Sequence, residues 1–255
     1  MDRPTPHEIL NPTVCHCSPE IRKSKIINLP FVRQALPRSM DALIRCFRSE
    51  GLTEGRDISS LRYPEGLFGV VARGAIKVYQ WVNDDQFVIF DVLTEGDWFL
   101  YGNPGCSGPH IYCYPDQIST MTTSCLLTMD RVKLLQVLET DAKLMESLFF
   151  EATRRLTSAN QRLVRLLSLS AEQKLAFLLL FLLGKSKRQA EYSGLIPFKL
   201  TKKDLASMMG ITLETVSRLL SAWEAEGVTH SGRGWVEVID EDFLRKKFHL
   251  SESLD

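Results

Sequence analysis

Three side chains that could contact the bases of DNA, those of Glu214, Ser217 and Arg218, lie close together in the sequence. At spacings of three and four, a carboxylate, a hydroxyl and a guanidinium share one face of a helix. In the major groove, arginine forms two hydrogen bonds to guanine and glutamate accepts one from cytosine. On an exposed helix these residues would therefore supply sequence-specific contacts to double-stranded DNA.

The surrounding residues have the pattern of a helix-turn-helix. Ala206 is small enough to let two helices approach, and Gly210 can take the positive φ that the turn needs. Val216 and Leu219, three residues apart, would bury the second helix against the first. Thr215 and the three candidate base-contacting residues would then remain on the outer face. Short helix hairpins also carry Ala and Gly at these places for packing alone, so the spacing by itself leaves a purely structural role open.

The overall charge does not indicate a polyanionic partner. The 255 residues contain 31 basic and 31 acidic side chains, and from Lys199 onward acids slightly outnumber bases. Contacts to the DNA backbone would therefore depend on local cations and hydroxyls. The candidates are Lys199, Thr201, Lys202, Lys203, Thr212, Thr215 and Arg233.

The N-terminal segment is polar and broken by prolines, which is not the pattern of a signal peptide. The longest apolar run, residues 175–183, is too short to span a bilayer. We therefore expect a cytoplasmic protein that does not associate with membranes. In that compartment its six cysteines would be thiols, metal ligands or redox sensors rather than structural disulfides.

The elements that would position these residues follow from periodicity and turn residues. Residues 1–30 are expected to be irregular, and 31–50 have helical spacing. Short β runs at 67–71, 75–82, 86–93 and 118–129, separated by glycines and acidic turns, predict an antiparallel barrel or roll. Ser170 and Gln173 form a capping box ahead of a helix over 175–183 that ends at Gly184. Two β runs around Gly232-Arg233-Gly234 predict the wing of a winged helix.

A long helix is expected from about residue 130 to 167. Its apolar residues recur at steps of three and four, which is typical of a coiled coil, although packing on the helix's own domain would give the same pattern. The residues of this predicted stripe are Met145, Leu148, Ala152, Leu156, Ala159, Leu163 and Leu166.

Residues 214–218, Glu-Thr-Val-Ser-Arg, closely resemble the recognition helix of CRP/FNR transcription regulators, whose FNR branch has Glu-Thr-(Ile/Val)-Ser-Arg. Residues 73–79 and 95–99 resemble two glycine-containing elements of that family's β-roll domain. The resemblance covers roughly residues 50–248. It implies an α+β fold with an irregular segment (1–30), a β-roll sensor domain (31–130), a dimerisation helix (131–168) and a winged helix-turn-helix (169–255).

The resemblance also implies a homodimer that binds a palindromic operator through Glu214, Ser217 and Arg218, with RNA polymerase as a further partner. Position 213 is Leu and position 217 is Ser, where the cyclic-AMP-responsive branch has arginine and glycine. At both positions the residue resembles that of the FNR branch. The implied operator therefore resembles TTGAT, four base pairs, then ATCAA.

The effector is expected to be a redox, gas or small-molecule signal. The family's Gly-Glu and Arg-(Ser/Thr) phosphate-binding residues have no counterpart here, and no arginine occurs between Arg73 and Arg131. This argues against cyclic AMP, because a buried phosphodiester needs a cationic partner. An iron–sulfur cluster, a haem, and a thiol switch or small organic ligand remain open. The candidate residues are Cys15, His16, Cys17, Tyr101, Cys106, His110 and Cys113.

The main alternative is a cupin-like barrel acting as a metal-dependent enzyme or as a ligand-binding module. Such a barrel needs two or three histidines clustered on its strands, whereas the five histidines are scattered along this sequence. The sequence also contains no Ser–His–acid grouping, phosphate loop or HExxH helix. We therefore expect a protein that is not an enzyme.

Overall fold

The computed structural model describes residues 18–58, 66–101, 117–186 and 194–248. Its internal contacts divide the chain into two units. The first contains Pro12–Gln80 and Leu93–Asn160, and the second contains Trp81–Val92 and Gln161–Asp255. The tip of one β hairpin, Trp81–Val92, therefore groups with the C-terminal unit.

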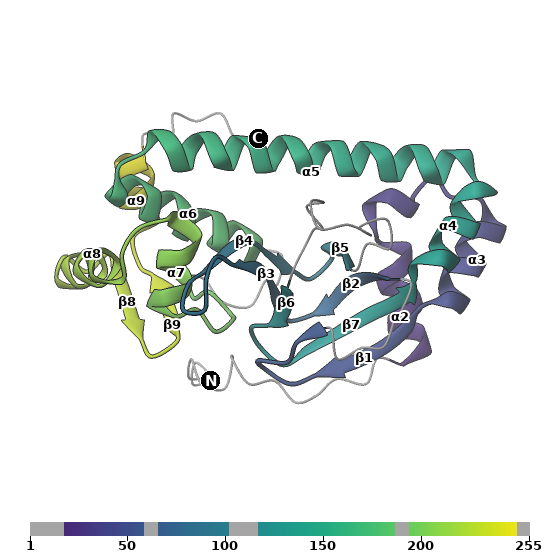
Figure 1. Cartoon of the computed structure of the whole chain (residues 1–255), viewed down its shortest axis with the longest axis horizontal. Helices are drawn as coiled ribbons and strands as arrows, with labels where there is room; N and C mark the ends of the chain where they lie inside the picture. Colours follow the sequence, from purple (N-terminus) through teal and green to yellow (C-terminus); the bar gives the residue numbers. More distant parts are fainter. Residues whose placement is uncertain (1–17, 59–65, 102–116, 187–193, 249–255) are drawn as a thin grey trace. The chain divides into compact units, whose positions relative to one another are not determined.

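Helices come before and after a run of strands (Figure 1). The part up to the last strand of the roll comprises α2 (Pro19–Ile27), η1 (Pro30–Val32), α3 (Pro37–Cys46), β1 (Arg48–Leu52), β2 (Leu67–Arg73), β3 (Ala75–Trp81), β4 (Phe87–Thr94), β5 (Trp98–Tyr101), β6 (Gln117–Thr120) and β7 (Ser124–Asp130). The remainder comprises α4 (Arg131–Glu139), α5 (Ala142–Ser168), α6 (Ala171–Ser186), α7 (Lys202–Met209), α8 (Leu213–Ala225), β8 (Thr229–Gly232), β9 (Trp235–Val238) and α9 (Glu241–Phe248).

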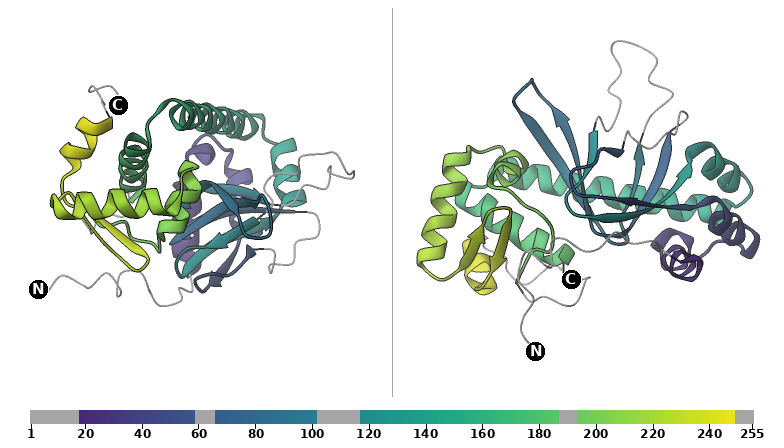
Figure 2. Two further views of the ribbon diagram at one scale, coloured as in Figure 1. Left: turned by 60° about the vertical axis from the view of Figure 1, so that its left-hand side comes forward. Right: turned by 90° about the horizontal axis from the view of Figure 1, so that it is seen from below.

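The predicted antiparallel roll is confirmed. One sheet has the order β1-β7-β2-β5 and a second has the order β4-β3-β6. Gly69 of β2 lies so close to the Phe99 ring of β5 that a Cβ there would stand 2.2 Å from it. The expected wing is also confirmed, because β8 and β9 pair antiparallel and lie beside α8 (Figure 2). Among the described residues, no helix combines the length and the apolar character needed to cross a bilayer.

Several expected boundaries were wrong. Part of the N-terminal segment expected to be irregular is helical, with Ser18 capping α2. The helix expected over 31–50 begins later, at Pro37 after the short turn η1, and ends earlier, at Cys46, where β1 follows because its residues pair with β7. The helix α6 continues past Gly184 to Ser186, so that glycine does not end it.

The capping box of Ser170 and Gln173 is confirmed, with reciprocal bonds of 3.1 and 3.3 Å.

The long helix expected over 131–168 is interrupted. It forms α4 and α5, separated at Thr140 and Asp141. Asp141 is buried, and its carboxylate accepts from the backbone N–H of Leu144 at 3.1 Å, which caps α5. The other carboxylate oxygen accepts from the N–H of Leu36 at 2.7 Å, at the start of α3. One side chain therefore links the beginnings of two helices.

Asp141 should make the first unit sensitive to acid. Burial raises the pKa of its carboxyl, but hydrogen bonds from the backbone of Leu36, the side chain of Ser39 and the backbone of Leu144 and Lys143 together outweigh burial and hold the pKa below its ordinary value. Its contribution is then complete above the unfolded-state pKa of about 4 and is lost as the pH falls through the lower folded-state value. We expect Asp141→Asn to reduce the free energy of unfolding by about 1–3 kcal/mol at neutral pH.

Urea unfolding at neutral and acidic pH measures this effect. The difference between Asp141→Asn and the unsubstituted protein should shrink at acidic pH, where both side chains are uncharged. Asp41→Asn on the exposed face of α3 is the matched control and should have little effect. An unchanged difference across the pH range would show that the ionised carboxylate is not responsible.

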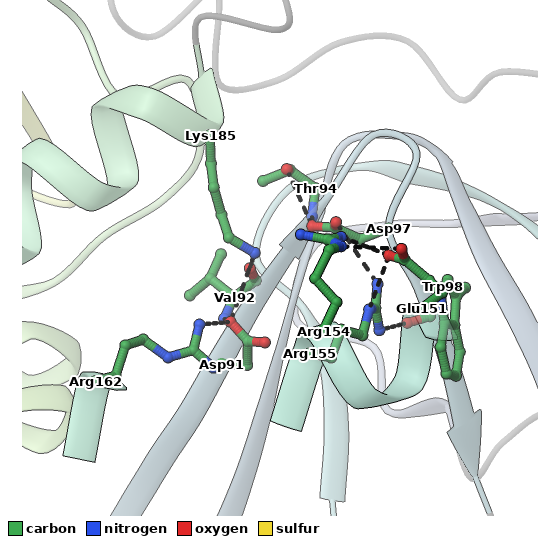
Figure 3. A network of polar contacts seen from close by, with 10 residues as sticks. All are labelled: Asp91, Val92, Thr94, Asp97, Trp98, Glu151, Arg154, Arg155, Arg162 and Lys185. Carbon is green, nitrogen blue, oxygen red and sulfur yellow. Dashed lines mark hydrogen bonds and ion pairs between the residues drawn. The ribbon is translucent and has the colours of Figure 1, made fainter. Parts of the chain in front are cut away.

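A second group of polar contacts holds α5 against the roll within the first unit. The Arg155 guanidinium lies over the Trp98 ring at 4.2 Å and 3.7 Å from the Asp97 carboxylate, and it donates to the Trp98 carbonyl (Figure 3). Asp97 also accepts from the Thr94 N–H at 2.9 Å, which shapes the turn before β5. These contacts fix the register of α5 on the roll.

Candidate nucleic-acid interface

The first helix of the helix-turn-helix is α7, and its start is fixed by a complete capping box. The Thr201 hydroxyl accepts from the Asp204 N–H at 3.0 Å, and the Asp204 carboxylate accepts from the Thr201 N–H at 3.0 Å. Asp204 is buried, so this arrangement is held by packing as well as by hydrogen bonds. It determines the direction in which Lys202 and Lys203 leave the first turn.

The turn has the predicted chemistry. Gly210 ends α7 with φ of 61°, in the left-handed region, and its N–H donates to the Ala206 carbonyl. Ala206 is buried, as expected for a position where two helices approach. Thr212 then caps α8 by accepting from the Thr215 N–H at 3.2 Å. A glycine and a threonine two residues apart therefore set the angle between the helices.

One face of α8 is buried, and of the predicted pair Val216 lies fully within that face while Leu219 does not. Val216, Leu220 and Trp223 are fully buried, whereas Leu219 is only half-buried. The prediction for Leu219 was therefore wrong by one position. The buried face runs from Val216 to Leu220, four residues on, and then to Trp223, three residues further on. The opposite face leaves Glu214 and Arg218 exposed.

The remaining two outer-face residues are partly buried and hydrogen-bonded. The Ser217 hydroxyl lies 3.1 Å from Lys202 Nζ, which reaches it from α7. The Thr215 and Thr212 hydroxyls lie 3.0 Å apart. Lys202 is one of the candidate backbone contacts, and in the structure its amine also reaches the candidate base-contacting face of α8. The sequence pattern contained no indication of this pairing.

The other three cations proposed as backbone contacts lie in the turn of the wing, in the segment before α7 and on α7 itself. Arg233 is exposed at the turn between β8 and β9. The exposed Lys199 lies beside the same turn, since a Cβ on Gly234 would stand 3.1 Å from its Cγ. Lys203 is exposed on α7, where its amine lies 5.3 Å from the Phe87 ring centroid. A wing and a helix thus each present cations near the helix-turn-helix.

Within the C-terminal unit, the hairpin tip contacts α7 beside the turn. The Ser207 hydroxyl donates to the Phe87 carbonyl at 2.7 Å and accepts from the Ile89 N–H at 3.0 Å. A cavity of about 390 Å³ lies alongside, bordered by the hairpin and by residues that include Lys203 and Thr212. Sequence periodicity could not have shown this contact, because Ser207 and Phe87 are distant in the chain.

The same hairpin carries an ion-pair centre in this unit. The Asp91 carboxylate lies 3.2 Å from the Arg162 guanidinium and 3.5 Å from Lys185 Nζ (Figure 3). Lys185 also donates to the Val92 carbonyl at 2.6 Å. Both cations lie near the Phe181 ring, at 5.2 and 5.4 Å from its centroid. These partly buried contacts hold the end of α5, α6 and the hairpin together.

The helix α5 exposes most of the predicted stripe. Leu156 is 62% and Leu163 is 54% exposed, and Met145, Ala152 and Ala159 are also exposed. Leu148 is an exception, because it packs against the core cluster of its own unit, and Leu166 is half-buried. Phe149, which is not part of the predicted stripe, is 66% exposed. With Phe149 in place of Leu148, the steps along the helix alternate strictly between four and three, which is the heptad pattern.

Of the candidate effector residues, the structure describes only Tyr101. It is half-buried at the end of β5 and packs against a core cluster of the roll. Cys15, His16, Cys17, Cys106, His110 and Cys113 lie outside the described residues. Within the described ranges, no group of three or more His, Cys, Asp or Glu side chains is arranged to hold a metal ion. Cys46 and Cys125 contribute to apolar packing, as small hydrophobic side chains do.

Comparisons with known proteins agree with this architecture. Residues 173–247 match the Crp-like helix-turn-helix domain. The nitrogen fixation regulation protein FixK of Bradyrhizobium diazoefficiens is 28% identical over 173 residues, covering 67% of this chain and 69% of FixK. The transcriptional activatory protein AadR of Rhodopseudomonas palustris is 28% identical over 170 residues, covering 66% and 67%. The structure of FixK2 from Bradyrhizobium japonicum has a TM-score of 0.62 and 22% identity, covering 78% of this chain and 96% of FixK2.

Proposed function

The chain belongs to the CRP/FNR family of DNA-binding transcription regulators, and from this we propose that it acts as a homodimer on an inverted repeat. The proposed operator resembles TTGAT, four base pairs, then ATCAA. The observation that carries the proposal is the outer face of α8, where Glu214 and Arg218 are exposed while the opposite face is buried. The alternative of a cupin-like enzyme or ligand-binding module is not favoured, because the relatives are named as regulators.

The proposed operator follows from the resemblance of α8 to the recognition helix of the FNR branch. Glu214, Ser217 and Arg218 would contact bases, and the half-buried Ser217 and exposed Leu213 are the residues similar to the FNR branch. The exposed stripe of α5 would pair with a second copy in parallel. Such a dimer presents one recognition helix to each of two successive major grooves, about 34 Å apart. An inverted repeat is the sequence symmetry that this arrangement requires.

The backbone contribution would be local. Lys199 and Arg233 at the wing and Lys203 on α7 are exposed, and with Thr201, Lys202, Thr212 and Thr215 they form the proposed backbone set. Acids slightly outnumber bases from Lys199 onward, so general positive charge contributes little. Binding would therefore depend on the dimer and on its base contacts. RNA polymerase is the proposed further partner once the operator is occupied.

The roll of the first unit would sense the redox, gas or small-molecule signal. Visible absorption of protein purified without oxygen separates the proposed effectors. A Soret band would indicate haem, a broad brown absorbance with labile sulfide would indicate an iron–sulfur cluster, and a colourless protein would indicate a thiol switch or an organic ligand.

Mobility shifts at about 150 mM salt test the proposed DNA binding, since affinities depend on ionic strength. The TTGAT…ATCAA duplex should bind at least about a thousand-fold more tightly than a scrambled duplex of equal length. Both are compared under oxidising and under reducing conditions, because the effector would control the active state. Equal affinity for the two duplexes under both conditions would overturn the proposed operator.

A further inference from the structure

Lys202 and Ser217 form a direct link between the two helices of the helix-turn-helix. Lys202 is the first residue of α7, and its Nζ lies 3.1 Å from the Ser217 hydroxyl in the first half of α8. Both side chains are half-buried. The capping box at Thr201 fixes the start of α7, so the lysine is directed to this place by the local backbone.

The chemistry of the pair determines the direction of the hydrogen bond. A lysine ammonium has three donors and no acceptor, so the Ser217 oxygen must accept. Hydroxyls on α5 instead donate to the carbonyl four residues earlier, as Thr153, Thr157 and Ser168 do at 2.9–3.1 Å. Within the described part of the chain, the Ser217 hydroxyl makes one hydrogen bond, the one that it accepts from Lys202. The hydroxyl proton of Ser217 is therefore available to a ligand.

We propose that Lys202 is a specificity-determining residue that holds Ser217 as a hydrogen-bond donor toward the bases. This rests on the proposed function, in which Ser217 contacts the major groove. A serine alone can donate or accept, so it discriminates weakly among bases. Accepting from lysine uses one of the two lone pairs of the Ser217 oxygen and places a positive charge 3.1 Å from it, so the hydroxyl favours the acceptors thymine O4 or guanine O6 and N7 over a base donor. It disfavours cytosine, which presents only the N4 amino donor in the major groove.

Lys203 provides a matched comparison on the same helix. It is exposed and its amine lies near Phe87, 5.3 Å from the ring centroid, with no contact to Ser217 in the structure. A cation of that kind would act on phosphates and would not change which base is preferred. The two adjacent lysines therefore differ in their expected effects, one on base preference and the other on overall affinity.

The test uses full-length protein and duplexes in which each half-site position carries each of the four bases in turn. Ser217→Ala first identifies the position whose preference depends on the hydroxyl. At that position the unsubstituted protein should disfavour cytosine relative to thymine by about three- to ten-fold, the ratio that one hydrogen bond provides. Lys202→Met should reduce this ratio to less than about two-fold, whereas Lys202→Arg, which also only donates, should retain it. Lys202→Gln, whose amide both donates and accepts, replaces the methionine variant if that variant does not fold.

Lys203→Met should weaken binding to all duplexes alike and leave the ratio unchanged. An unchanged cytosine ratio in Lys202→Met, with operator preference intact, would overturn this inference alone. An equal loss of the ratio in Lys202→Arg would also overturn it, since the donor would then not be the cause. Absence of any base preference in the unsubstituted protein would overturn the proposed function together with it.

Discussion

Replacing Arg218 by alanine is expected to abolish the preference for the inverted repeat while leaving weak binding to any duplex. Arg218 is exposed on α8, one turn after Glu214, so its removal should change stability by less than about 0.5 kcal/mol. A bidentate contact from arginine to guanine provides roughly 1–3 kcal/mol of discrimination. A dimer makes this contact twice, so the preference should fall by a factor between roughly thirty and twenty thousand.

Competition binding on the operator and on a scrambled duplex, each at several salt concentrations, measures this loss. Binding that remains in Arg218→Ala should be strongly salt-dependent, since phosphate contacts then supply most of the affinity. Arg218→Lys keeps the charge but not the planar fork, so it should also lose selectivity. Arg233→Ala at the wing turn is the control and should weaken binding to both duplexes equally. An equal loss on both duplexes in Arg218→Ala would assign that residue to the backbone instead.

The helix-turn-helix could be predicted because its determinants are local in sequence. Gly210 takes the left-handed conformation that the turn requires, and Ala206 is buried where the helices approach. Both follow from the size of a side chain and the steric limits on φ. The capping box at Ser170 and Gln173 is likewise a short-range feature. Such signals depend mainly on the neighbouring backbone, although they can still fail, as at Gly184, where α6 continues to Ser186.

Predictions of boundaries and faces failed where packing decided the outcome. Leu219 and Leu220 are equally apolar, and only the packing of α8 against α6, α7 and β8 makes Leu220 the buried one. The break before Asp141 depends on its bond to Leu36, a residue that lies far away in the sequence. Leu148 has the correct spacing for the predicted stripe, but the core of its own unit covers it. Hydrophobic periodicity identifies an apolar face without identifying what packs against it.

The contacts that could not be predicted at all join side chains of separate elements. Lys202 is a plausible phosphate contact from its charge, yet its amine bonds to Ser217. Ser207 satisfies two backbone groups of a hairpin tip more than one hundred residues earlier. A long flexible side chain or a hydroxyl has no periodic pattern, so only the folded arrangement shows its partner.

Glutamates at both Leu156 and Leu163 are expected to convert the proposed dimer into monomers. These leucines are 62% and 54% exposed in the single chain, so the substitutions should leave the fold of each subunit intact. Burial of one leucine contributes about 1.5–3 kcal/mol, and a two-fold interface would lose four of them, roughly 6–12 kcal/mol in total. Since a nanomolar dimer is held by about 12 kcal/mol, the dissociation constant should rise by several orders of magnitude.

Sedimentation at micromolar concentration measures the oligomeric state, and circular dichroism checks that the helices are retained. Because a monomer can contact only one half-site, operator affinity should fall to that of a single half-site duplex. Leu167→Glu is the matched control, because Leu167 is 80% exposed on the same helix but lies outside the heptad positions. It should remain dimeric. If the double variant also sediments as a dimer with full operator affinity, the stripe from Met145 to Leu166 is not the interface, and a different surface must bring the two recognition helices into register.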